Sequence, residues 1–157
     1  AVARRLHCPD IENSEWTPPV SSRMTATIFS DLGQASLFMA LPWVQEMLNQ
    51  SLGYRPFPAT LNVRPTAATD AAVWRRVQNT FLGLRLAPAN SDYCAARLFR
   101  IALYRAGSAA GDSVTAAVLL PEVADYPKDK IEIVAPMRLK DHLGIADGDS
   151  LIVEFLN

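Results

Sequence analysis

The last quarter of the chain carries an unbroken pattern of strand, short helix, turn and strand. Residues 130–134 alternate between polar and apolar side chains, as strands with one buried face do. Residues 136–143 predict one or two helical turns, which Gly144 ends in the way that glycine commonly ends helices. Residues 147–149, Asp-Gly-Asp, then predict a turn into a second alternating run at 150–155. The four elements form one continuous unit.

The preceding residues predict further short strands. Alternating apolar side chains and flanking turn residues indicate strands at 24–29, 60–63, 84–88, 95–104 and 114–120. Residues 30–36 interrupt the first strand as a loop, and the small residues of 106–112 predict a hairpin connection. Arg97 and Arg100 are three residues apart on one strand, so we expect them on opposite faces.

Two segments have the spacing of amphipathic helices instead. Pro42 opens the first, which ends at Gly53. The second covers residues 70–81, with Thr69 or Asp70 as its N-cap. The expected fold class is therefore mainly β with short helices, an α+β arrangement.

The 157 residues fit a single domain preceded by an arm. Residues 1–22 mix charges with prolines and lack sustained periodicity, which indicates an irregular N-terminal arm. No hydrophobic stretch of signal-peptide length follows the basic first residues. We expect one domain at 23–157.

The composition excludes some classes of protein. The formal net charge is −1, so no global electrostatic attraction to nucleic acid is expected. No apolar run approaches the roughly 20 residues of a membrane-spanning helix. Cys8 and Cys94 lie in unlike contexts without metal-ligand spacing, which indicates a reduced, cytoplasmic chain. His7 and His142 are far apart in the sequence, which argues against histidine-based catalysis, and no catalytic group is assigned.

Thr60 and Asn62 form a candidate magnesium site. Pro56 and Pro58 favour extended backbone before them, and the alternation places Thr60 and Asn62 on one strand face. A hydroxyl and an amide oxygen two residues apart can share a hard cation, and Mg²⁺ usually keeps waters and substrate phosphates in its shell. The alternative interpretation is a strand with a polar, solvated face.

Two longer segments carry a family resemblance. Residues 52–63 read Leu-Gly-Tyr-Arg-Pro-Phe-Pro-Ala-Thr-Leu-Asn-Val, and residues 131–140 read Ile-Glu-Ile-Val-Ala-Pro-Met-Arg-Leu-Lys. In this order and at this separation, they resemble the archaeal-type CTP-dependent riboflavin kinase family. The resemblance spans roughly residues 25–155. It implies a compact cradle-loop β-barrel.

The resemblance also implies an activity, its ligands and site residues. The family transfers the γ-phosphoryl group of CTP to riboflavin, giving FMN, with Mg²⁺. By resemblance, Thr60 and Asn62 are Mg²⁺ ligands, and Glu132 and Ala124 stand at flavin-contacting positions. The positions that match the cytidine nucleotide site are Leu32, Gly33, Gln34, Ala35, Ser36, Leu37, Met137, Arg138, Leu139 and Lys140. Riboflavin or FMN and a cytidine nucleotide are the expected partners.

The chain departs from the family pattern at several positions. Of the three glycines in the family's phosphate loop, residues 31–37 keep Gly33, and Asp31 adds negative charge where a triphosphate would lie. Ala59 replaces a glycine, and Ala124 stands at the position that matches a flavin-contacting threonine of the family, with Tyr126 as the alternative source of a hydroxyl. A catalytically degenerate flavin- or nucleotide-binding protein is therefore the alternative to an active kinase.

A DNA-binding regulator is the rival from another functional class. The C-terminal unit also resembles the strand, helix, Gly-Asp and strand element of small swapped-hairpin transcription factors, which dimerise and bind DNA. The near-neutral charge argues against it, as does the segment with Thr60 and Asn62, which those DNA-binding proteins lack. The sequence leaves the oligomeric state open.

Overall fold

The computed structural model of the protein describes residues 22–31, 33, 35–88, 92–108 and 110–156. Its elements, in chain order, are β1 (Arg23–Ile28), α1 (Ala35–Met39), α2 (Pro42–Leu52), β2 (Leu61–Pro65), α3 (Ala68–Thr80), β3 (Leu84–Leu86), β4 (Ala96–Arg105), the 3₁₀ turn η2 (Ala110–Asp112), β5 (Val114–Pro121), β6 (Ile131–Val134), α4 (Leu139–Leu143) and β7 (Ser150–Phe155). Except for Ser22, the predicted arm lies outside the described residues, as does Cys8. The division into arm and domain stays a prediction.

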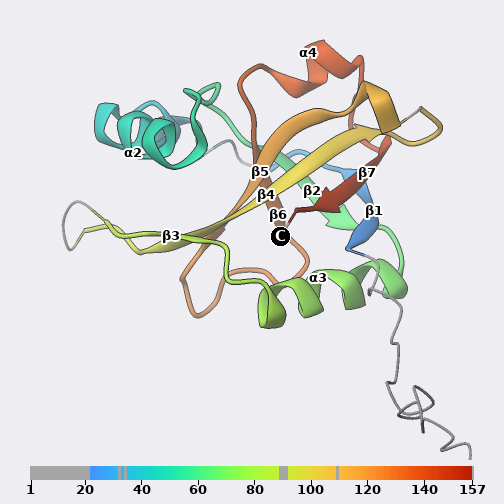
Figure 1. The fold of residues 1–157 in the computed structure, drawn as a ribbon, viewed down its shortest axis with the longest axis horizontal. Coiled ribbons are helices and arrows are strands. Elements are labelled where there is room, and N and C mark those ends of the chain that lie inside the picture. Colours follow the sequence, from blue (N-terminus) through green and yellow to red (C-terminus); the bar gives the residue numbers. More distant parts are fainter. Residues whose placement is uncertain (1–21, 32, 34, 89–91, 109, 157) are drawn as a thin grey trace, which may run out of the picture.

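The strands form a closed antiparallel barrel (Figure 1). Their order is β4-β5-β6-β2-β1-β7, and pairing of β7 with β4 closes the ring. The short strand β3 lies outside this ring and extends β4. The expected mainly β fold with short helices is confirmed, and so is the barrel that the resemblance implied. Among the described helices, none has the length and apolar character needed to cross a membrane.

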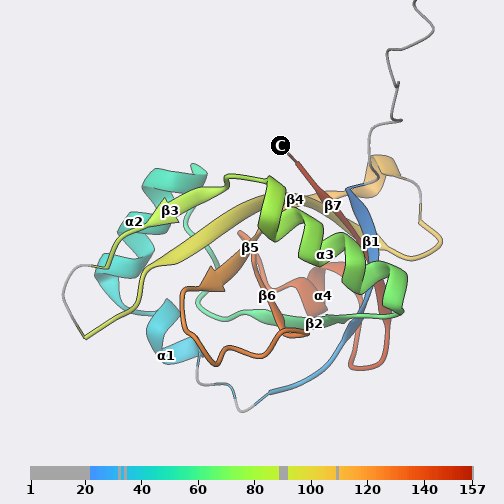
Figure 2. The same cartoon turned by 90° about the horizontal axis from the view of Figure 1, so that it is seen from below.

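Alternating side chains fill the barrel and helices cover its ends. On β2, Leu61 and Val63 are buried in the interior cluster, as the alternation predicted. Trp74 of α3 stacks on Phe155 at a centroid distance of 5.6 Å and meets Phe99 edge-on at 5.8 Å. Truncating such a buried aromatic typically costs about 3–5 kcal/mol, so Trp74 anchors α3 to the barrel. Figure 1 shows α4 on the opposite side of the barrel from α3, and Figure 2 looks onto α3 from below.

A second apolar cluster packs α1 and α2 against the outside of the barrel. Val44 and Leu48 of α2 join Leu98 of β4 and Leu119 of β5 there. The two β4 arginines reach different helices, which confirms their opposite faces. Arg97 donates to the carbonyl of Gln78 in α3 at 3.1 Å, and Arg100 donates to the carbonyl of Ser51 in α2 at 2.8 Å.

Two local predictions were wrong. Helix α1 begins at Ala35, inside the segment predicted as a loop, because packing buries Met39 in the outer cluster where the local pattern gave no signal. Helix α3 begins at Ala68 rather than at 70, so neither Thr69 nor Asp70 is its N-cap. Asp70 instead accepts the backbone N–H groups of Ala67 at 3.0 Å and Thr25 at 2.9 Å, and this fixes the start of α3 to β1.

Candidate active site

The pairing of β2 with β6 brings the two sequence motifs together. Asn62 lies directly opposite Glu132 in the antiparallel register, on the outer face of the barrel. Thr60, just before β2, donates a 3.3 Å hydrogen bond from Oγ1 to Oε1 of Glu132. Glu132 is 7% exposed and is the one charged residue among the described residues that is buried. The candidate metal ligands and the candidate flavin contact therefore share one site.

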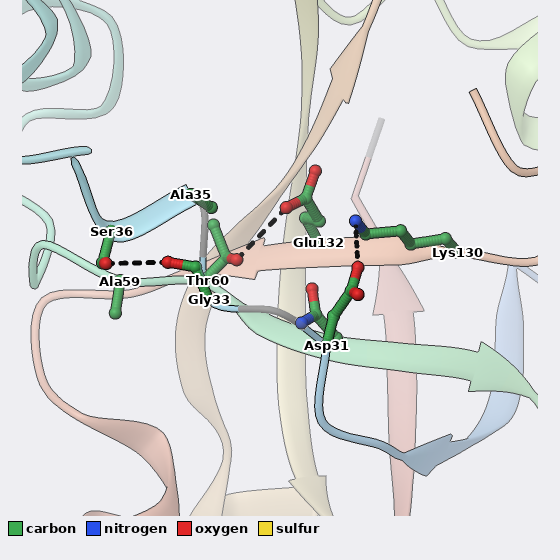
Figure 3. Close-up of a pocket in the computed structure, with 9 residues that line it drawn as sticks. Asp31, Gly33, Ala35, Ser36, Ala59, Thr60, Lys130 and Glu132 are labelled. Atoms are coloured by element: carbon green, nitrogen blue, oxygen red, sulfur yellow. Dashed lines mark hydrogen bonds and ion pairs between the residues drawn. The ribbon is translucent and has the colours of Figure 1, made fainter. Parts of the chain in front are cut away.

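A cavity of about 90 Å³ opens beside these three side chains (Figure 3). Its other lining residues come from the segment before and at the start of α1 and from the residues directly before β2 and β6; they are Asp31, Gly33, Ala35, Ser36, Ala59 and Lys130. The Ser36 hydroxyl donates to the carbonyl of Gly33 at 2.9 Å. We call this space the phosphate cavity.

The oxygen atoms around the phosphate cavity fit a Mg²⁺ ion. Oδ1 of Asn62 is buried and has no hydrogen-bond partner among the described residues, although a buried amide oxygen normally has one. Together with the Thr60 hydroxyl it offers two neutral oxygens, the ligand type that Mg²⁺ prefers. The described residues contain no group of three or more histidine, cysteine, aspartate or glutamate side chains that could hold a metal. The donor set suits an ion that brings phosphates and waters as its other ligands.

Tyr126 forms a hydrogen bond with the second carboxylate oxygen of Glu132. Its hydroxyl donates to Oε2 at 2.6 Å. Burial raises the pKa of Tyr126 well above its usual value, and the hydrogen bond and negative charge of Glu132 raise that pKa further. The hydroxyl therefore remains a donor at neutral pH, so that both oxygens of Glu132 are held in place.

Lys130 places a positive charge at the phosphate cavity. Its ammonium group pairs with the carboxylate of Asp31 at 2.5 Å and lies 5.7 Å from the ring centre of Tyr126. The sequence interpretation did not single out Lys130 as a site residue. The signal was present, because Lys130 and Glu132 are two residues apart on an alternating strand and so share a face.

A second cavity of about 140 Å³ adjoins the first and shares Ala59 and Thr60 with it. The predicted nucleotide residues Met137, Arg138, Leu139 and Lys140 all line it. We call it the nucleoside cavity. Of the predicted loop residues, Gly33, Ala35 and Ser36 line the phosphate cavity instead.

Lys140, which lines the nucleoside cavity, is connected through Asp147 to Ser30 in the segment after β1. Its ammonium group lies 3.0 Å from Oδ1 of Asp147, whose Oδ2 accepts a 2.5 Å hydrogen bond from Ser30. These hydrogen bonds, first that of Ser30 and then that of Lys140, lower the pKa of Asp147 below its usual value. The arrangement holds Lys140 beside the cavity.

Two of the predicted site residues that the structure describes are not brought to these cavities. Leu37 is 80% exposed and lines neither cavity, and Ala124 is exposed on a separate groove between α3 and residues 122–129. Leu32 and Gln34 lie outside the described residues. Tyr126, which lines the groove with Ala124, is the residue that connects this loop to Glu132.

An apolar cavity of about 260 Å³ lies on the same outer face of the barrel. Three aromatic side chains, Phe38, Trp43 and Tyr93, line it with ring centres 5.0–5.9 Å apart. Leu119, another lining residue, lies directly opposite Glu132 in the pairing of β5 with β6. The apolar cavity therefore adjoins the carboxylate on the side away from Asn62.

A family model and several curated relatives all match this chain to riboflavin kinases. The model of the CTP-dependent riboflavin kinase family, described as a domain of unknown function (DUF120), matches residues 28–155. The riboflavin kinase of Pyrobaculum islandicum is 30% identical over 139 residues, which are 86% of this chain and 61% of that protein. The corresponding protein of Pyrobaculum arsenaticum is 33% identical over 140 residues, 87% of this chain and 61% of that protein.

An archaeon of another genus gives a similar match. The riboflavin kinase of Methanoculleus marisnigri is 31% identical over 144 residues, 83% of this chain and 56% of that protein. The chain thus spans about three fifths of the length of these curated relatives. On the family match and these identities, the chain belongs to the CTP-dependent riboflavin kinase family.

Proposed function

We propose that this chain transfers the γ-phosphoryl group of CTP to riboflavin, producing FMN and CDP. The observation that carries the proposal is the buried Oδ1 of Asn62, which has no partner among the described residues and lies beside the Thr60 hydroxyl at the phosphate cavity. A polar atom buried in this way costs free energy unless a ligand completes its bonding. The names of the relatives supply the substrate class.

In this proposal Thr60 and Asn62 hold Mg²⁺. The bound ion would offset negative charge on the phosphates as the transferred group moves. The residues of the chain then have to bind, orient and shield the two substrates.

The nucleotide occupies the two adjoining cavities. Met137, Arg138, Leu139 and Lys140 bind the cytidine, because they line the nucleoside cavity. The triphosphate passes Thr60 into the phosphate cavity, beside Gly33, Ala35 and Ser36. Leu32, Gln34 and Leu37 complete the nucleotide-binding segment by resemblance to the family. Since CTP is an intracellular nucleotide, the proposed reaction is cytoplasmic.

The flavin approaches from the other side of Glu132. Its ring system is flat and largely apolar, and the cavity lined by Trp43 and Tyr93 offers a surface of that kind. Because Leu119 of this cavity lies opposite Glu132, the ribityl chain extends from there across Glu132 toward the phosphate cavity.

The transfer step exchanges one bond to the γ-phosphorus for another and moves one proton. The terminal ribityl hydroxyl oxygen forms a bond to the γ-phosphorus, and the bond from that phosphorus to the oxygen bridging it to the β-phosphate breaks. The bond electrons leave with CDP, and the hydroxyl proton passes to the carboxylate of Glu132. Such reactions depend mainly on positioning and on charge neutralisation, which the fixed carboxylate and the nearby Lys130 serve.

A binding protein without turnover is the second candidate, and specific substitutions favour it. Ala35 and Ala59 both line the phosphate cavity at positions where the family pattern has glycine, so each adds a Cβ atom beside the proposed phosphates. Asp31 adds a carboxylate there. These changes affect phosphate binding more directly than the fold.

Product analysis separates the two candidates. The protein is mixed with riboflavin, Mg²⁺ and either CTP or ATP, and FMN is measured by chromatography. FMN formed with CTP and not with ATP supports the CTP-dependent kinase. Absence of FMN with both nucleotides, together with a rise in melting temperature on adding FMN or CTP, supports the binding protein.

A further inference from the structure

Asp31 brings a negative charge to the cavity proposed to hold phosphates. By itself, that charge would repel a triphosphate. The structure instead pairs it with Lys130, the residue directly before β6 (Figure 3). At the phosphate cavity, the pair therefore joins the segment after β1 to the residue before β6.

Lys130 is placed where a phosphate-binding cation is needed. It is the one lysine or arginine among the described residues that line the phosphate cavity. Its side chain is 21% exposed, so it is partly withdrawn from water, and its alternation with Glu132 directs both toward the same face of β6. An ammonium group in such a place attracts phosphate more strongly than one on an open surface.

We propose that Lys130 is a phosphate-binding residue and that Asp31 is a positioning residue that occupies Lys130 until the nucleotide binds. The inference rests on the proposed function, since it assigns the phosphate contact of the same site. On binding, Lys130 exchanges the carboxylate for a phosphate oxygen.

The exchange is energetically reasonable. The Asp31 side chain is 36% exposed, and ion pairs open to water contribute little net stability. A triphosphate carries several negative charges and forms charge-assisted hydrogen bonds with an ammonium donor. Asp31 thus competes with phosphate for Lys130. It holds the lysine side chain at the phosphate cavity and lowers the affinity of that cavity for phosphate.

The alternative role for Asp31 makes the opposite prediction. If Asp31 were an additional Mg²⁺ ligand, its removal would weaken the binding of the metal-bound nucleotide. If it competes for Lys130, its removal strengthens phosphate binding with or without Mg²⁺. The sign of the change in affinity therefore separates the two roles.

The experiment measures binding of inorganic triphosphate and of CTP by calorimetry, each with and without Mg²⁺. The variants are Lys130→Met, Lys130→Arg, Asp31→Asn and the double variant Lys130→Met/Asp31→Asn. Lys128→Met is the matched control, because Lys128 belongs to the same loop and does not line the phosphate cavity. Melting temperatures verify that each variant is folded, and FMN formation is measured in parallel.

We expect Lys130→Met to weaken triphosphate binding about 10- to 100-fold, the usual loss for a hydrogen bond to a charged group. Lys130→Arg should retain most of the affinity, and Lys128→Met should bind like the unaltered protein. Asp31→Asn should bind triphosphate more tightly, and the double variant should lose that gain. In the kinetics, Asp31→Asn should lower KM for CTP more than it changes kcat.

Unchanged triphosphate binding by Lys130→Met would overturn the assignment, and so would weaker binding by Asp31→Asn. Failure of the proposed function gives a different result. Binding that depends on Lys130 without any FMN would contradict the kinase activity and support the phosphate contact. FMN formation by Lys130→Met with an unaltered KM for CTP would support the kinase activity and contradict the phosphate contact of Lys130.

Discussion

The hydroxyl of Tyr126 donates a 2.6 Å hydrogen bond to Oε2 of Glu132. The carboxylate receives its other hydrogen bond from Thr60, so it is held between the loop that precedes β6 and the strand that carries the proposed metal ligands. A carboxylate held on both oxygens has a fixed position relative to a bound substrate.

Replacing Tyr126 by phenylalanine should impair the use of riboflavin. We expect kcat/KM for riboflavin to fall about tenfold, the typical effect of losing one hydrogen bond to a charged group, while KM for CTP stays unchanged. Steady-state kinetics with each substrate varied in turn measures this. Tyr104→Phe is the control, because Tyr104 is buried on β4 outside all three cavities. Equal kcat/KM values in Tyr126→Phe and the unaltered protein would contradict the assigned role.

Replacing Trp43 by leucine tests the proposed location of the flavin ring. Loss of an aromatic wall should weaken riboflavin binding about tenfold, with KM for CTP unaffected. Flavin fluorescence reports the binding directly. Arg75→Ala alters the groove that contains Ala124 and should leave riboflavin binding unaffected. Normal binding by Trp43→Leu and weakened binding by Arg75→Ala would instead place the ring in the groove.

We expect ionisation of Tyr54 to lower the free energy of unfolding at alkaline pH. Burial raises the pKa of Tyr54 to about 12, against a smaller lowering by the charge of Arg100. The folded-state pKa thus lies above the unfolded value of about 10. Its contribution to stability is therefore complete below pH 10 or so and is lost as the pH rises toward about 12.

Tyr54→Phe should reduce this loss of stability. Since the Tyr54 hydroxyl is buried without a partner among the described residues, we also expect the variant to be at least as stable as the unaltered protein at neutral pH. Denaturant unfolding at about pH 8 and about pH 11 gives both free energies of unfolding. The same alkaline decrease in both proteins would show that Tyr54 does not cause it.

Asp70 should be important for stability although it is not the N-cap. Asp70→Ala removes acceptors for the backbone N–H groups of Ala67 and Thr25, and we expect a loss of about 1–3 kcal/mol in the free energy of unfolding. Thr69→Ala, at the exposed neighbouring position, should change it by less than about 0.5 kcal/mol. Urea unfolding measures both variants. A larger effect from Thr69→Ala would favour the helix start predicted from the sequence.

Local patterns predicted the elements whose alternation or capping is self-contained. Leu61 and Val63 point inward as their alternation required, and Gly144 ends α4 with a positive φ of 62°. Helix α1 was missed because its burial comes from contact with α2 rather than from its own periodicity. The closure of β7 on β4 likewise depends on strands distant in sequence; the family resemblance implied a barrel but not this pairing.

The candidate site was predicted where both motifs supplied its residues. Thr60, Asn62 and Glu132 meet because β2 pairs with β6 in one register. The ion pair of Lys130 with Asp31 could not be predicted in the same way, because the loop conformation that brings the two side chains together is set by tertiary structure.

The most direct test of the account is Mg²⁺-dependent formation of FMN from riboflavin and CTP by the unaltered protein and by Thr60→Val/Asn62→Leu. Thr27→Val is the matched control, since Thr27 forms its hydrogen bond with Thr66, away from the cavities. We predict FMN with the unaltered protein and with Thr27→Val, and none with the double variant at an unchanged content of secondary structure. FMN formation by the double variant at the rate of the unaltered protein, or none by the unaltered protein, would contradict the account.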